Sequence, residues 1–127
     1  MQNIFVDTNA WMSLGQHHVP LFQEIERLFG SSAKIFVLSG TISELQKIVD
    51  SARGKDKLAA KLALQIIEKK VIEKELSVSE KEGYVDDLLV EESKRKNLVI
   101  TADFVLQKRL KRPYIIIKKN KFLELRE

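Results

Sequence analysis

Short apolar runs alternate along the chain with longer segments whose apolar residues recur every three or four positions. A run of three or four β-branched, aromatic or leucine residues is typical of a strand buried on both faces, whereas the wider spacing is typical of a helix. We therefore expect strands at residues 4–6, 35–38, 98–100 and 114–117, with a weaker one at 71–72. Helices are expected at residues 21–29, 41–53, 56–66, 79–96 and 104–110.

This alternation predicts an α/β protein, a three-layer α/β/α sandwich with a mainly parallel, Rossmann-like central sheet. The sequence shows neither a repeat nor a linker, so we expect one domain over residues 1–127. No apolar run approaches the roughly 20 residues of a membrane span, and the first residues lack the pattern of a signal peptide. We therefore expect a cytoplasmic protein without membrane contact.

The composition excludes some kinds of chemistry. The chain has no cysteine, so disulfides, thiolate zinc sites and cysteine nucleophiles are excluded. A phosphatase of the haloacid dehalogenase type would need Asp-x-Asp after the first strand, but Asn9 occupies the second position. The formal net charge of +4 at pH 7 favours a polyanionic partner.

Four acidic residues are expected at one edge of the sheet. Asp7 and Asp103 follow strands directly, Glu44 lies in the first helical turn after another strand, and Asp86 precedes the strand of Asp103. Parallel sheets bind ligands beyond the carboxyl ends of their strands. Hard oxygen ligands suit Mg²⁺ or Mn²⁺, which activates water and neutralises charge at a phosphodiester under attack.

Each of these acids also has a structural alternative. Asp7 could form an Asx turn, Glu44 could complete a capping box with Thr41, Asp103 could cap a helix, and Asp86 could belong to a buried ion pair. Any one of the acids alone fits such a role, but their convergence on one edge favours a shared site.

The third acid is one of two neighbours, Asp86 and Asp87. On a helical wheel Asp86 falls within the apolar arc that contains Leu89 and Val90, whereas Asp87 points away from that arc. Burying a carboxylate is costly unless a charge meets it. The pattern therefore favours Asp86 as the inward-facing acid, with Asp87 as the alternate.

The order of these motifs resembles a PIN domain over essentially the whole chain. The resemblance rests on Asp-Thr-Asn after the first strand, Glu-Leu at 44–45, the acidic pair at 86–87 and Thr-x-Asp at 101–103. PIN domains include many metal-dependent ribonucleases. The resemblance implies Asp7, Glu44, Asp86 and Asp103 as catalytic and metal-binding acids, with Asp87 as a further candidate ligand of Mg²⁺ or Mn²⁺. It implies that Thr8, Asn9 and Thr101 orient those carboxylates.

Within this family, the acidic pair and the segment 54–57 resemble the branch that processes ribosomal RNA, although Ala102 replaces the asparagine usual there. We therefore expect a divalent-metal-dependent endoribonuclease that acts on ribosomal RNA or its precursor, with the pre-ribosome as a partner. The alternatives are a toxin ribonuclease that pairs with an antitoxin, and an RNA-binding module that does not cleave. A homodimer is compatible with each of these functions.

The end of the chain is strongly basic. Seven basic residues and no acid lie between positions 108 and 121, and we expect them to bind RNA phosphates beside the acids: Lys108, Arg109, Lys111, Arg112, Lys118, Lys119 and Lys121. The alternative is that lysines flank an apolar edge strand and prevent it from pairing with other chains.

Overall fold

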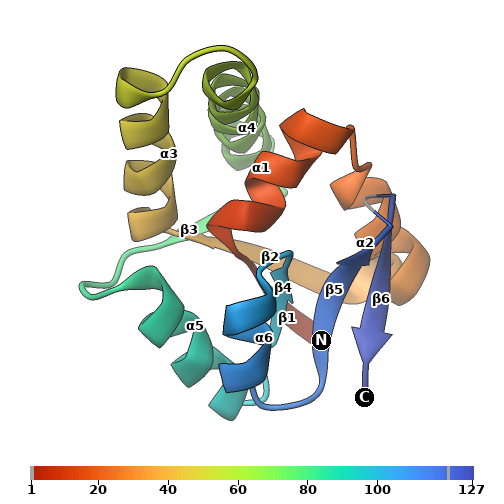
Figure 1. Cartoon of the computed structure of the whole chain (residues 1–127). Helices are drawn as coiled ribbons and strands as arrows, with labels where there is room; N and C mark the ends of the chain where they lie inside the picture. Colours follow the sequence, from red (N-terminus) through yellow and green to blue (C-terminus); the bar gives the residue numbers. More distant parts are fainter. Residues whose placement is uncertain (1, 120) are drawn as a thin grey trace.

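β1 (Gln2–Val6) lies inside a six-stranded sheet that has helices on both faces (Figure 1). In the computed structural model, which describes residues 2–119 and 121–127, the strand order is β3-β2-β1-β4-β5-β6. Neighbouring strands are parallel except for the antiparallel pair β5 and β6. This confirms the predicted α/β sandwich with a mainly parallel sheet. The other strands are β2 (Ala33–Leu38), β3 (Ser77–Ser79), β4 (Leu98–Thr101), β5 (Tyr114–Lys118) and β6 (Phe122–Arg126), and the helices are α1 (Thr8–His17), α2 (Leu21–Phe29), η1 (Gly30–Ser32), α3 (Ser39–Ser51), α4 (Lys55–Ile72), α5 (Val85–Lys94) and α6 (Phe104–Arg109).

Successive side chains of each strand point to opposite faces of the sheet, so two apolar clusters form. Ile4 and Val6 belong to the cluster under α1, α2 and α4, whereas Phe5 belongs to the cluster under α5 and α6. The same alternation separates Ile115 from Ile116 on β5. Because both faces are covered, the strands have continuous apolar sequences.

The chain passes from β1 to β2 on one side and later enters β4 on the other side of β1. The carboxyl ends of β1 and β4 are therefore neighbours, and open α/β sheets bind ligands at such a switch point. Asp7 follows β1 and caps α1, and Asp103 follows β4 and caps α6. This places the two strand-end acids side by side.

Two predicted element bounds were wrong. Val71 and Ile72 end α4 instead of forming a strand, and the strand is β3, which pairs with β2. The helix expected from residue 79 begins at Val85, because the preceding residues form a loop in which Gly83 has a φ of 129°. Glycine adopts this backbone conformation without the strain of a side chain. Among the helices of the described ranges, none is long and apolar enough to cross a membrane.

Three elements, α1, η1 and β6, were not predicted. α1 has buried residues on nearly all sides, and Gly15 within it packs so closely on α4 that a Cβ there would lie 2.6 Å from the Ala59 Cα. β6 pairs with β5 from Tyr114 to Lys118, so β5 is not an edge strand. The interpretation of the nearby lysines as protection for an exposed edge at β5 is therefore wrong.

Candidate functional site

Asp7 lies at the carboxyl end of β1 and is almost fully buried, with 3% of its surface exposed. Its Oδ1 accepts the Thr8 backbone N–H at 2.7 Å, and its Oδ2 accepts the Thr101 hydroxyl at 2.8 Å. The Asp7 N–H donates to the Ile100 carbonyl of the neighbouring strand at 2.9 Å. These contacts hold the carboxylate in one orientation where β1 and β4 end.

Thr101 joins the two strand-end acids, because its hydroxyl also accepts the Asp103 backbone N–H at 2.9 Å. Asp103 Oδ1 accepts the N–H groups of Val105 and Leu106 at 2.8 and 3.3 Å. Asp103 therefore caps α6, which is the structural role considered for it from the sequence. Asp103 Oδ2 lies 3.5 Å from Asn9 Nδ2. The cap thus uses one carboxylate oxygen of Asp103 and leaves the other beside Asn9.

Glu44 reaches the site through Thr8, whose hydroxyl donates to Glu44 Oε1 at 2.5 Å and lies 3.1 Å from the Thr41 hydroxyl. The capping-box interpretation of Thr41 and Glu44 is wrong, since α3 begins at Ser39 without a side-chain cap and Thr41 is buried inside it. Thr41 was missed as a member of the site. A threonine three residues before a glutamate is the pattern of a capping box. Nothing in the sequence therefore distinguished a Thr41 that contacts Thr8 from a Thr41 that caps a helix.

Asp86 and Asp87 both lie in the first turn of α5, and both are exposed. The expectation that Asp86 is buried is wrong, because α5 begins only at Val85 and its first turn therefore stands at the open edge of the sheet. Asp87 Oδ1 accepts Arg109 Nη2 at 2.6 Å, so the ion pair considered for Asp86 belongs to its neighbour. Asp86 makes no ion pair with any residue in the described ranges.

The pKa values show which acids lie close together. The pKa of Asp7 is raised from 3.8 to about 6, chiefly by burial and also by the charges of Asp86 and Asp103, although hydrogen bonds from Thr101 and Thr8 oppose the rise. Partial burial also raises the pKa of Asp86, followed by the charge of Asp103, and only Arg109 lowers it. Three of the predicted acids therefore form one electrostatically coupled group.

The chemistry of this group fits a divalent cation. All of its ligand atoms are carboxylate oxygens, which Mg²⁺ and Mn²⁺ prefer, and Asp7 makes no ion pair with any described residue. Within residues 2–119 and 121–127, no three acidic or histidine side chains already converge on one ion position. Both oxygens of Asp7 and Oδ1 of Asp103 accept backbone or threonine donors, and Oδ2 of Asp103 lies near Asn9. Binding an ion therefore requires a rearrangement of side chains in this group.

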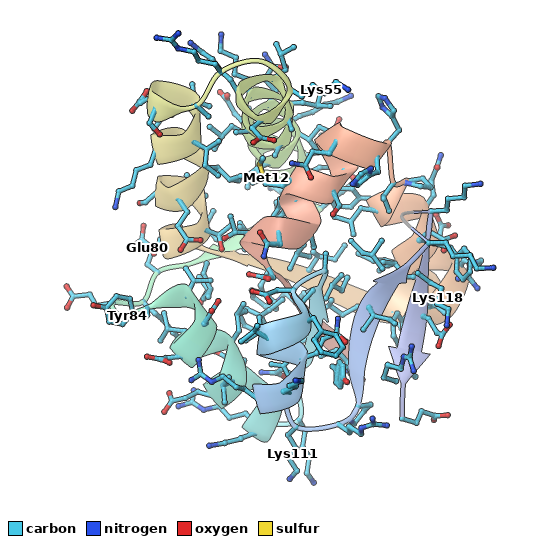
Figure 2. The ribbon with its side chains drawn as sticks, in the orientation of Figure 1. Met12, Lys55, Glu80, Tyr84, Lys111 and Lys118 are labelled. Atoms are coloured by element: carbon cyan, nitrogen blue, oxygen red, sulfur yellow. The ribbon has the colours of Figure 1, made fainter. Side chains whose placement is uncertain are left out.

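The basic residues do not form one rim beside the acids. Lys118 ends β5 on the edge of the sheet where Asp7 lies, whereas Lys111 and Arg112 precede β5 and lie at its opposite end. Figure 2 shows Lys111 and Lys118 far apart on the surface. Arg109 is engaged with Asp87, as described above. Besides Arg109, the residues on the edge of the sheet where the acids lie are Lys118, Lys119 and Lys121, at the carboxyl end of β5.

Comparisons with known proteins agree with this geometry. Ribonuclease VapC4 of Methanocaldococcus jannaschii is 29% identical over 132 residues, which cover 98% of this chain and 97% of the relative. The structure of the PIN domain endonuclease Utp24 superposes with a TM-score of 0.74 at 19% identity, covering 97% of this chain and 90% of Utp24. A domain of a functionally unknown protein from M. jannaschii superposes with a TM-score of 0.58 at 19% identity, covering 85% and 83%.

The two structural likenesses establish the fold. The family model described as PIN like domain matches residues 4–120, which include the end of β1, the acids at both strand ends and β5. The chain therefore belongs to the PIN-like domain family, as the order of its sequence motifs predicted.

Proposed function

We propose that the chain, acting as a single nuclease domain, is a divalent-metal-dependent endoribonuclease that hydrolyses RNA phosphodiester bonds. The observation that carries the proposal is Asp7, a buried carboxylate with two other acids in electrostatic reach and no ion pair to any described residue. Such a group is costly in a fold without a cation. The likeness to Ribonuclease VapC4 supports RNA as the substrate.

In this proposal Asp7, Glu44, Asp86 and Asp103 hold Mg²⁺ or Mn²⁺. The bound ion supplies charge neutralisation at the phosphodiester and lowers the pKa of water. The protein supplies orientation: the Thr101 hydroxyl fixes Asp7 and the backbone of Asp103. Arg109 keeps Asp87 engaged outside the group, which leaves Asp86 as the third acid.

Cleavage of a structured RNA with Mn²⁺, Mg²⁺ or EDTA tests the proposal. Wild type should cut internally with either metal and not in EDTA, and Asp7→Asn should lose cleavage. Asp50→Asn, on the exposed side of α3, is the matched control and should cleave like wild type. Equal cleavage by wild type and Asp7→Asn would assign the activity to a contaminant. RNA binding without cleavage by wild type would leave the non-cleaving module as the function.

Two roles fit this activity. The acidic pair at 86–87 and the segment 54–57, which resemble the branch of the family that processes ribosomal RNA, support that role, with the pre-ribosome as partner. The 29% identity to Ribonuclease VapC4 over nearly the whole chain supports equally a toxin that an antitoxin holds in check. Expression of wild type and Asp7→Asn separates them, because only a toxin should arrest growth in an Asp7-dependent way.

A further inference from the structure

A surface hollow of about 320 Å³ lies between α6 and the start of β5. It is lined by Phe104, Gln107, Lys108, Leu110, Arg112 and Tyr114. Phe104 directly follows Asp103, so the hollow begins beside the acids and extends along α6 away from them. The hollow therefore extends from Phe104, beside the acids, to Arg112 at the opposite end of β5.

Two cations in this hollow are held by aromatic rings and not by carboxylates. Lys108 Nζ lies 4.8 Å from the centre of the Phe104 ring, and Arg112 Cζ lies 5.8 Å from the centre of the Tyr114 ring. In the part of the chain that the structure describes, neither cation makes an ion pair. Arg109 between them differs, because it pairs with Asp87. The two charges are therefore available to an anion.

Lys108 lies over one face of the Phe104 ring, but the residue is still 68% exposed, so part of the ring surface is open to a ligand. Stacking of bases on exposed aromatic rings is a common contact of single-stranded nucleic acids. A base in a duplex has both faces covered by its neighbours, so only an unpaired base can stack there. The hollow thus offers one ring face and two unpaired cations in a volume that suits one nucleotide.

We propose that this hollow binds one unpaired nucleotide of an RNA strand that crosses the acids. The base stacks on Phe104, and Lys108 and Arg112 contact the adjoining phosphates. The inference rests on the proposed function for the identity of the polymer, and it makes single-stranded RNA the preferred substrate. It assigns Phe104 a binding role beside the cleavage site.

RNA binding by the full chain carrying Asp7→Asn tests this without any cleavage. Fluorescence anisotropy is measured with a labelled single-stranded decamer and with a duplex of the same sequence. Adding Phe104→Ala should weaken single-strand binding about tenfold, within the range of one lost base stack, and should change duplex binding little. Phe104→Trp should keep the affinity, because it retains a ring face. Val105→Ala is the matched control, since Val105 is 70% exposed at the next position but lies outside the hollow.

The cations are tested through the salt dependence of binding. Lys108→Gln with Arg112→Gln should reduce the salt slope by about 1.4, since each lost phosphate contact on a single strand removes about 0.7. Lys61→Gln, an exposed lysine on α4, should leave the slope unchanged. A single abasic position in the RNA decamer should weaken its binding to the protein that retains Phe104. The same abasic RNA should bind the Phe104→Ala variant no more weakly than intact RNA does.

Unchanged single-strand binding by Phe104→Ala would overturn the inference. An equal loss of affinity with Val105→Ala would also overturn it, because both substitutions would then act through the folding of α6. An equal loss on duplex RNA would also overturn it. Failure of the proposed function is recognised separately. If wild type binds RNA in this way but never cleaves it, the nuclease proposal fails and the nucleotide-binding hollow stands.

Discussion

Asp7 and Glu92 are carboxylates of similar burial, 3% and 4% exposed, whose surroundings differ in charge. Glu92 Oε2 accepts the Lys81 ammonium at 2.5 Å, and its Oε1 accepts the Asn97 amide at 2.9 Å. Asp7 accepts a hydroxyl and a backbone N–H, and its nearest charges are those of two aspartates. One carboxylate is neutralised inside the protein, and the other is not.

The difference separates a structural acid from a candidate functional one. A buried ion pair that is complete ties two elements together, here the loop before α5 and the end of that helix. An acid that is buried among like charges lowers the stability of the fold, and such positions are typical of sites kept for activity. A bound cation would give Asp7 the partner that Lys81 gives Glu92.

The largest stability effect is expected at the completed pair. Glu92→Gln should lower the free energy of unfolding by about 3 kcal/mol, because the Lys81 ammonium then loses its partner. Lys81 is about one-third exposed, which limits the loss. Urea unfolding measures it. RNA cleavage by the folded variant should equal that of wild type, and a loss of cleavage would show that Glu92 is not merely structural.

The pH dependence of the metal-free protein should report Asp7. A carboxyl whose pKa rises from 3.8 to about 6 on folding contributes stability that is present below pH 3.8 and is lost as the pH rises through 6. Two pKa units correspond to at most about 3 kcal/mol. Unfolding in EDTA at pH 4 to 7 should show this decline in wild type, and Asp7→Asn should lack it. An identical pH profile in both proteins would contradict the raised pKa.

A smaller difference is expected between the neighbouring acids of α5. Asp86→Asn should weaken Mn²⁺ binding about tenfold, since Asp86 is coupled to Asp7 and Asp103, whereas Asp87→Asn should change it little because Arg109 already holds Asp87. Titration of Mn²⁺ into each variant measures the affinities. A larger loss with Asp87→Asn would reverse the assignment of the third acid.

The sequence predicted the interior strands and the fold class, because strands buried on both faces are continuous apolar runs. It did not predict α1, whose contacts on nearly all sides remove the amphipathic period, and whose Gly15 resembles a turn until its close packing on Ala59 is known. β6 was missed although Leu123 and Leu125 alternate with charged residues, which is the pattern of a strand with one covered face. β3 has only three residues and depends on pairing with β2.

The acids of the candidate site were predicted from strand ends and motif order, but their contacts were not. The bond between Thr8 and Glu44 joins residues 36 positions apart, and that between Asp87 and Arg109 joins residues 22 apart. Such pairings depend on where helices begin and which way their first turns face. The late start of α5 alone moved Asp86 from an expected buried position to the open edge.

Thermal melting in EDTA and in Mn²⁺ tests most directly the claim that Asp7 is an acid kept for a cation. The proteins are wild type, Asp7→Asn and Glu92→Gln at pH 7. In EDTA, Asp7→Asn should melt above wild type, because a buried charge is removed, and Glu92→Gln should melt below it. Added Mn²⁺ should raise the Tm of wild type and Glu92→Gln alike, and that of Asp7→Asn much less. A lower Tm for Asp7→Asn in EDTA, together with no response of wild type to Mn²⁺, would contradict the account.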